Sequence, residues 1–124
     1  MQDERRKNER RRFAYYMPVI DNRTQQCLGY LSDISAEGFK LDSQKTVIIN
    51  ADYTMRLDLT SEIARKSDIV FLARAKWSQA DPVNPNEYVH GFQLVNIRPD
   101  EYVIYQQIVE KFSRQQSTGP GSFA

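Results

Sequence analysis

Apolar and polar residues alternate along the middle of the chain with the two-residue period of β-strands. Residues 53–59 show the clearest alternation, because every second residue from Tyr53 onward is apolar. Residues 68–78 show a second one, with one face formed by Ile69, Phe71, Ala73, Ala75 and Trp77. Since successive side chains of a strand point to opposite faces, both segments are predicted to be half-buried strands. Arg74 and Lys76 then stand on the solvent-exposed face of the second strand.

Further segments complete the predicted sheet. Residues 13–20 combine aromatic and β-branched residues, although Pro18 indicates a sheet edge or a bend. The polar turn of residues 21–26 folds the chain back into a strand at residues 27–32. The start of the first strand therefore lies beside the end of the second. The remaining strands are predicted at residues 39–42 and 88–95.

The pattern changes to a helical one after residue 98. Pro99 suits the first turn of a helix, where its missing N–H is not needed, and Asp100 and Glu101 complement the positive end of the helix dipole. Apolar residues then recur at helical spacing as Tyr102, Tyr105, Val109 and Phe112. Such a stripe usually packs against the protein's own core, and a docking site for a partner is the alternative interpretation.

The positive charge of the chain is concentrated in its first twelve residues. The 124 residues together carry a formal net charge of +1. Residues 1–12 hold six basic and three acidic side chains, whereas the remainder holds eleven basic and thirteen acidic ones. Because they show no apolar periodicity, residues 1–12 are predicted to form a flexible basic arm. Residues 13–113 then form one folded domain, and residues 114–124 form a disordered tail.

The sequence lacks the signatures of common catalytic and metal sites. It contains no G-x-S-x-G, no G-x-x-x-x-G-K-[ST] and no H-E-x-x-H motif, and Cys27 and His90 are its only cysteine and histidine. We therefore predict a binding module without catalytic residues, metal ions or cofactors, and not an enzyme. No apolar run approaches the roughly 20 residues that span a bilayer, and a single cysteine forms no internal disulfide. A cytoplasmic protein without membrane contact is expected.

Asp33, Ser35 and Gly38 stand at fixed offsets in the predicted turn between residues 32 and 39. One interpretation is structural: Asp33 and Ser35 hydrogen-bond turn amides, and Gly38 adopts the positive φ angle that short hairpins often need. The other is a guanine site. A carboxylate accepts hydrogen bonds from N1 and N2 of guanine, while arginine donates to N7 and O6 and pairs with phosphate. The arm and this turn would then bind a guanine nucleotide together.

Four features follow one another along the chain: Glu9-Arg10-Arg11-Arg12-Phe13, Asp33-x-Ser35-x-x-Gly38, Trp77, and Gly91-Phe92 ahead of the C-terminal helix. Over roughly residues 5–113 this order resembles the PilZ domain, the bacterial receptor module for cyclic di-GMP. The resemblance implies a mainly β fold, a six- or seven-stranded antiparallel barrel with a C-terminal α-helix. It also implies an N-terminal segment that carries an R-x-x-x-R motif and folds over the ligand.

The resemblance implies which residues bind cyclic di-GMP and how binding is signalled. The expected ligand-binding residues are Arg6, Arg10, Arg11, Arg12, Asp33, Ser35 and Gly38. Two frames of the R-x-x-x-R motif stay open. In one, the leading arginine is Arg11 and the trailing position falls on Tyr15; in the other, the pair is Arg6 and Arg10. The arm, once ordered over the nucleotide, would present a new surface to an effector protein that the sequence does not identify.

Two other functions are open at this point. A PilZ-like domain that has lost the nucleotide would act only as a protein-interaction adaptor, which Tyr15 at an expected arginine position favours. A nonspecific nucleic-acid tether is favoured by the charge of the arm and disfavoured by the nearly neutral remainder of the chain. The expected function is that of a cyclic di-GMP receptor, with nucleic acid not expected as a partner.

Overall fold

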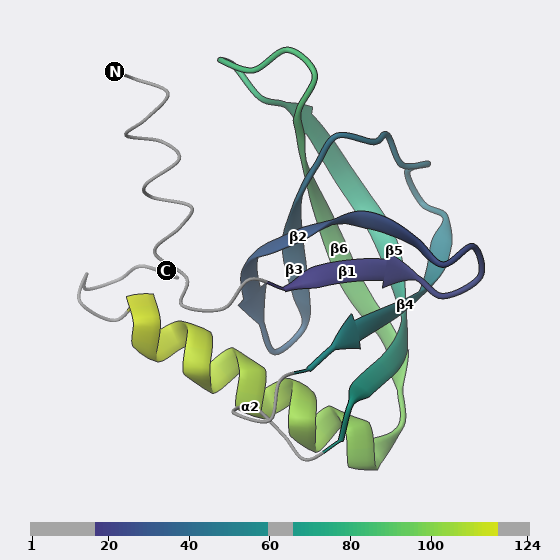
Figure 1. Cartoon of the computed structure of the whole chain (residues 1–124), viewed down its shortest axis with the longest axis vertical. Coiled ribbons are helices and arrows are strands. Elements are labelled where there is room, and N and C mark those ends of the chain that lie inside the picture. The colour runs from purple at the N-terminus through teal and green to yellow at the C-terminus, as the bar shows by residue number, and fades with distance from the viewer. Residues whose placement is uncertain (1–16, 60–65, 117–124) are drawn as a thin grey trace.

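The computed structural model describes residues 17–59 and 66–116, the last four of them by their backbone alone. Their elements are β1 (Pro18–Asp21), β2 (Gln26–Ser35), β3 (Gly38–Ser43), β4 (Asp52–Asp58), β5 (Asp68–Ala80), β6 (Tyr88–Ile97) and α2 (Pro99–Gln116). The strands pair antiparallel in the order β1-β2-β3-β6-β5-β4 and close into a barrel (Figure 1). The predicted mainly β fold, an antiparallel barrel with a C-terminal helix, is confirmed with six strands.

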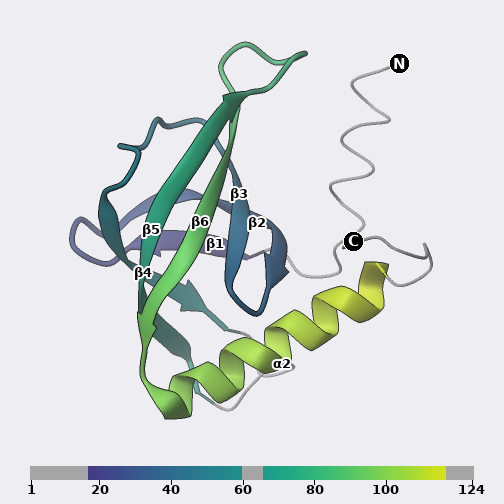
Figure 2. The same ribbon diagram turned by 180° about the vertical axis from the view of Figure 1, so that it is seen from behind.

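The strands predicted from alternation lie where they were expected. β4 buries Met55 and Leu57, and β5 buries Ile69 and Phe71. β5 and β6 pair along most of their length and form the longest wall of the barrel (Figure 2). Pro18 begins β1 and pairs with β2 but not with β4, as its missing N–H requires.

β2 extends three residues beyond its predicted end and carries the motif residues itself. It runs to Ser35, so Asp33 and Ser35 lie on the strand, and only Ala36 and Glu37 form the turn. Gly38 is the first residue of β3 and pairs with Ser35. The expectation that Asp33 and Ser35 occupy a turn is therefore wrong, because polar side chains on the outer face of a barrel are compatible with a continuing strand.

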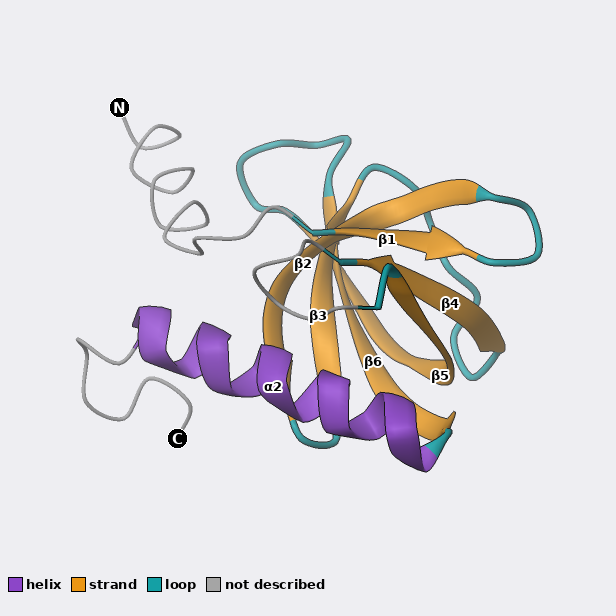
Figure 3. Ribbon diagram, turned by 60° about the horizontal axis from the view of Figure 1, so that its bottom comes forward, coloured by secondary structure: helices purple, strands orange, loops and turns teal. Residues whose placement is uncertain are grey.

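α2 lies across one end of the barrel, beside the β2–β3 turn (Figure 3). Tyr105, Ile108 and Phe112 are completely buried, while Tyr102 and Val109 pack against the core in part. The predicted apolar stripe thus packs on the protein's own core, and Ile108 belongs to it although it was not predicted. No helix in the described part of the chain has the length and apolar character that crossing a membrane requires.

Replacing Ile108 by alanine should lower the free energy of unfolding by about 2–5 kcal/mol, because the cavity would form between the helix and the barrel. Val103, which is 54% exposed on the same helix, provides the control. Its replacement by alanine should change stability by less than about 0.5 kcal/mol. Urea denaturation followed by circular dichroism measures both. Equal effects of the two substitutions would show that α2 does not close the core.

Candidate functional site

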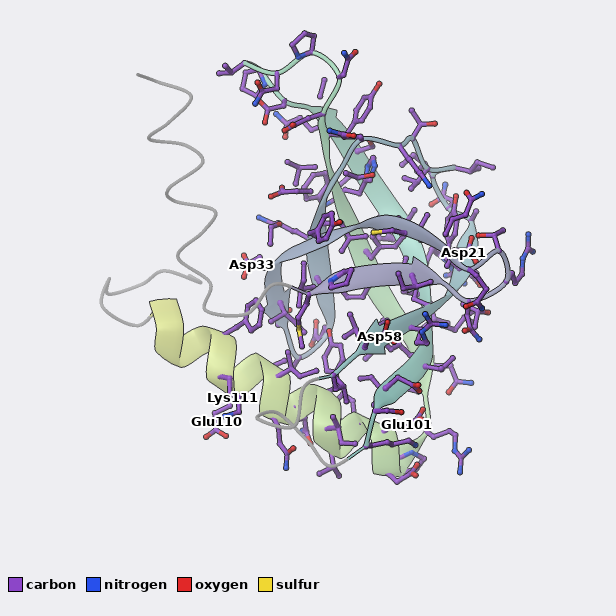
Figure 4. The ribbon with its side chains drawn as sticks, in the orientation of Figure 1. Asp21, Asp33, Asp58, Glu101, Glu110 and Lys111 are labelled. Atoms are coloured by element: carbon purple, nitrogen blue, oxygen red, sulfur yellow. The ribbon has the colours of Figure 1, made fainter. Side chains whose placement is uncertain are left out.

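A one-residue bulge in β2 decides which way Asp33 points. Leu31 pairs with Leu41, but Asp33 pairs with Lys40, which leaves Ser32 without a partner of its own in the ladder. Leu31 is buried inside the barrel, so simple alternation would turn Asp33 inward as well. The extra residue reverses this, because a shift of one position exchanges the two faces of a strand. Asp33 therefore lies on the outer side of β2 (Figure 4).

A second bulge, in β5, turns the side chain of Trp77 to the outside of the barrel. Ala75 pairs with Phe92, and Trp77 pairs with Gly91, so Lys76 is the extra residue. Trp77 was predicted to share the buried face of Ala75, and this prediction is wrong: its side chain is 39% exposed and lies outside the barrel. The alternation over residues 68–78 is interrupted by the bulge, which redirects the indole.

The two bulges align residues from four neighbouring strands. Pairing places Asp33, Lys40, Gly91 and Trp77 in one outward row across β2, β3, β6 and β5. The next outward row is formed by Ser35, Gly38, Gln93 and Arg74. Between them lies a buried row of Ile34, Phe39, Phe92 and Ala75. Three strand spacings separate the ends of a row, or about 14 Å.

Gly38 and Gly91 form the floor of the hollow between these rows. A Cβ atom on Gly38 would collide with the carbonyl oxygen of Phe92, and one on Gly91 would collide with the indole of Trp77. Gly38 does not have the positive φ angle that was expected. Glycine is required at both positions because other atoms approach its Cα closely. These atoms belong to the backbone of Phe92 at Gly38 and to the indole of Trp77 at Gly91.

The hollow is a pocket of about 400 Å³, within the size range of small-molecule sites. Its polar and aromatic lining includes Asp33, Ser35, Glu37, Lys40, Lys76, Trp77 and Gln93. The motif residues Asp33, Ser35 and Gly38 are thus brought together at one pocket. The arm residues Arg6, Arg10, Arg11 and Arg12, and Tyr15, lie outside the described residues.

The carboxylate of Asp33 is partly buried and accepts one hydrogen bond from the backbone. Its Oδ1 accepts one from the N–H of Ile34 at 2.8 Å. Burial raises the pKa of Asp33, although the Ile34 N–H and the charge of Lys40 oppose this shift. Its Oδ2 accepts no hydrogen bond from any described residue. A ligand with two N–H donors would compensate for the burial of this charge.

Ser35 forms a hydrogen bond to nearby backbone, but to a carbonyl group and not to a turn amide. Its Oγ donates to the carbonyl oxygen of Gly38 at 3.3 Å, across the turn. The structural interpretation holds only in part: Asp33 accepts from a backbone N–H, whereas Ser35 does not bond a turn amide and Gly38 lacks the positive φ angle. Their place in the lining of the pocket is what makes a binding role possible in addition.

Two tyrosines of α2 hold the β2–β3 turn from the other side. Tyr105 Oη donates to the carbonyl oxygens of Ser35 at 2.9 Å and Gly38 at 3.2 Å. Tyr102 Oη donates to the carbonyl oxygen of Ala36 at 3.2 Å. Burial raises the pKa of Tyr105 well above its usual range, so its hydroxyl remains a donor at physiological pH. The turn beside the pocket is thus anchored to the core by the helix.

Sequence reasoning missed Lys40 and Lys76 as candidate site residues. Lys40 follows Gly38 by two positions on the same face of β3, which is a signal that the motif itself offers. Lys76 could be found only by locating the bulge.

His90 is buried as a packed histidine, with Nδ1 2.9 Å from Ser78 Oγ and Nε2 2.7 Å from the carbonyl oxygen of Lys45. Among the described residues, no three potential metal ligands gather in one place.

Comparisons with known proteins agree with this fold. The family model of the PilZ domain matches residues 4–111. The PilZ domain of YcgR from Escherichia coli, solved with c-di-GMP, is 14% identical with a TM-score of 0.57, and the match covers 83% of this chain and 85% of that one. The inhibitor of motility MotI/DgrA from Bacillus subtilis is 12% identical with a TM-score of 0.57, over 83% of this chain and 46% of that one. No curated protein sequence matches significantly.

Replacing Gly91 by alanine should displace the indole of Trp77, because the new Cβ would occupy the position of the ring. Trp77 is the only tryptophan of the chain, so its fluorescence reports on this pocket alone. We expect its emission to shift to longer wavelength as the ring becomes more exposed. Val95→Ala, at a residue of β6 that is 39% exposed and outside the pocket lining, should leave the emission unchanged. An unaltered spectrum of Gly91→Ala would contradict the packing described here.

Proposed function

The chain belongs to the PilZ domain family, and on that premise we propose that it is a receptor for cyclic di-GMP. The observation that carries the proposal is the outward row across four strands, which sets the Asp33 carboxylate at a pocket beside Ser35 and Gly38. PilZ domains bind this nucleotide and act through effectors, and the YcgR domain with the same fold was solved with it.

In the proposed complex the barrel binds one edge of a guanine. Asp33 accepts hydrogen bonds from N1 and N2 of the base, and Ser35 contributes a hydroxyl beside it. Gly38, which has no side chain, lets the nucleotide approach the backbone. The binding residues belong to β2 and β3, and the helix keeps them in place through Tyr105.

The arm supplies the other half of the proposed site. Arg6, Arg10, Arg11 and Arg12 carry guanidinium groups that suit phosphates and the N7 and O6 edge of guanine. Ordering a flexible arm costs roughly 1–2 kcal/mol of backbone entropy per residue, so several arginines must contact the ligand together. The ordered arm then forms the surface that a cytoplasmic effector protein recognises. No residue has a catalytic role in this proposal.

A PilZ domain that no longer binds the nucleotide is the second candidate. Tyr15 favours it, because in one frame of the R-x-x-x-R motif it replaces the trailing arginine. Tyrosine stacks on a base but cannot form the charged pair with phosphate. In that case the protein would act as an adaptor and ignore cyclic di-GMP.

Replacing Asp33 by alanine should weaken the binding of cyclic di-GMP by about 1–3 kcal/mol, the usual value of a two-pronged contact to a base edge. Isothermal titration calorimetry measures the dissociation constant. Asp58→Ala, outside the pocket lining, is the matched control and should bind like the wild type. An unchanged dissociation constant for Asp33→Ala would remove this residue from the site.

The pH dependence of binding provides a second test of the role of the Asp33 carboxylate. The ligand favours the ionised carboxylate, so binding should lower the pKa that burial raises in the free protein. Affinity should therefore be full above the free-state pKa and fall by up to about tenfold per pH unit below it. Asp33→Ala should lack this fall. A wild type whose affinity has the same pH dependence as the variant would contradict the carboxylate's role.

The double variant Arg10→Ala, Arg11→Ala should lose most of the affinity, since it removes one arginine from each possible frame of the motif. Arg98→Ala, at a residue that is outside the pocket lining, serves as the control in the same titration. A wild type that fails to bind cyclic di-GMP would contradict the receptor function and favour the adaptor. If the double variant binds like the wild type, the arm has no part in the site.

A further inference from the structure

Lys40 and Lys76 place two ammonium groups at the pocket, outside the motif residues. Lys40 lies between Asp33 and Gly91 in the outward row, and its Nζ is 5.9 Å from the centre of the Trp77 ring. Lys76 is the extra residue of the β5 bulge, next to Trp77. Both side chains are exposed and both line the pocket. Both lysines therefore belong to the part of the pocket that Trp77 lines.

Neither lysine is neutralised by a salt bridge within the described residues. Two other cationic side chains do form salt bridges. The Arg74 guanidinium contacts the Asp52 carboxylate at 2.6 and 3.2 Å. The ammonium group of Lys66 contacts Glu101 at 2.8 Å. The carboxylates that line the pocket are Asp33 and Glu37, from β2 and the β2–β3 turn. Lys40 reaches Asp33 only by its long-range charge, so both lysines can pair with an added anion.

We infer that Lys40 and Lys76 bind the phosphate groups of the nucleotide, an inference that rests on the proposed function. A cyclic dinucleotide carries two phosphodiester charges, and the pocket offers two ammonium groups. Lys40 is the neighbour of Asp33 in the outward row, and Lys76 precedes Trp77 at the far end of that row. This complements the base contact, because Asp33 repels phosphate while it accepts from guanine. It also compensates for Tyr15, which carries no charge where one frame of the arm motif expects an arginine.

The β5 bulge explains why a lysine is available at position 76. In a regular strand, the inward and outward residues alternate, and Lys76 and Trp77 would point to opposite faces. The bulge leaves both exposed on the pocket side. A flexible lysine stem allows the ammonium group to follow a phosphate over several ångströms, which suits a ligand that is also held by the arm.

Isothermal titration with cyclic di-GMP tests the inference on the full chain. Lys40→Met and Lys76→Met keep the length of the stem and remove its charge, and each should weaken binding about tenfold at low salt. Lys40→Arg and Lys76→Arg keep the charge and should stay within about threefold of the wild type. Lys111→Met, on α2 and outside the pocket lining, is the control for loss of a lysine and should bind normally.

Salt dependence separates an ionic role from a structural one. Added sodium chloride screens charge pairs, so wild-type affinity should fall more steeply with salt than that of the double Lys40→Met, Lys76→Met variant. Wild-type binding with no loss in either methionine variant would overturn this inference and leave the receptor function intact. Equal loss in the methionine and arginine variants would also overturn it, as a packing effect. No binding by the wild type would overturn the receptor function and this inference together.

Discussion

The site depends on the register of four strands, because pairing alone brings its residues to one surface. Two single-residue bulges, one at Ser32 and one at Lys76, turn Asp33 and Trp77 from the inside of the barrel to the outside. The buried row beneath keeps this register: Phe39 and Phe92 stack with ring centres 5.4 Å apart. A shift by one residue would bury the Asp33 carboxylate in an apolar interior, at a large cost in free energy.

The helix adds a second constraint on the same surface. Tyr105 is buried in the core and donates to two carbonyl groups of the β2–β3 turn, so the turn cannot move without breaking core contacts. The β2–β3 corner of the pocket is thus preorganised by packing. Preorganisation of this kind lowers the entropy cost of binding.

The sequence was sufficient for the parts of the fold that follow simple periodicity. The alternation from Tyr53 to Leu59 predicted β4, and the helical stripe through Tyr105 and Phe112 predicted a helix packed on the core. The motif spacing grouped Asp33, Ser35 and Gly38, and all three line one pocket in the structure. The bulges could not be predicted, because one unpaired residue in a strand leaves no mark on composition. Trp77 was therefore placed on the wrong face, and Lys40 and Lys76 were not recognised as residues that line the pocket.

The central claim is that cyclic di-GMP binds across the outward row and is covered by the arm. Amide resonances of the ¹⁵N-labelled protein, recorded during a titration with the nucleotide, test it most directly. The account predicts that Asp33, Gly38 and Gly91 shift together with residues of the arm, at the same ligand concentrations. Resonances of the row and the arm that stay in place at saturating nucleotide would contradict it.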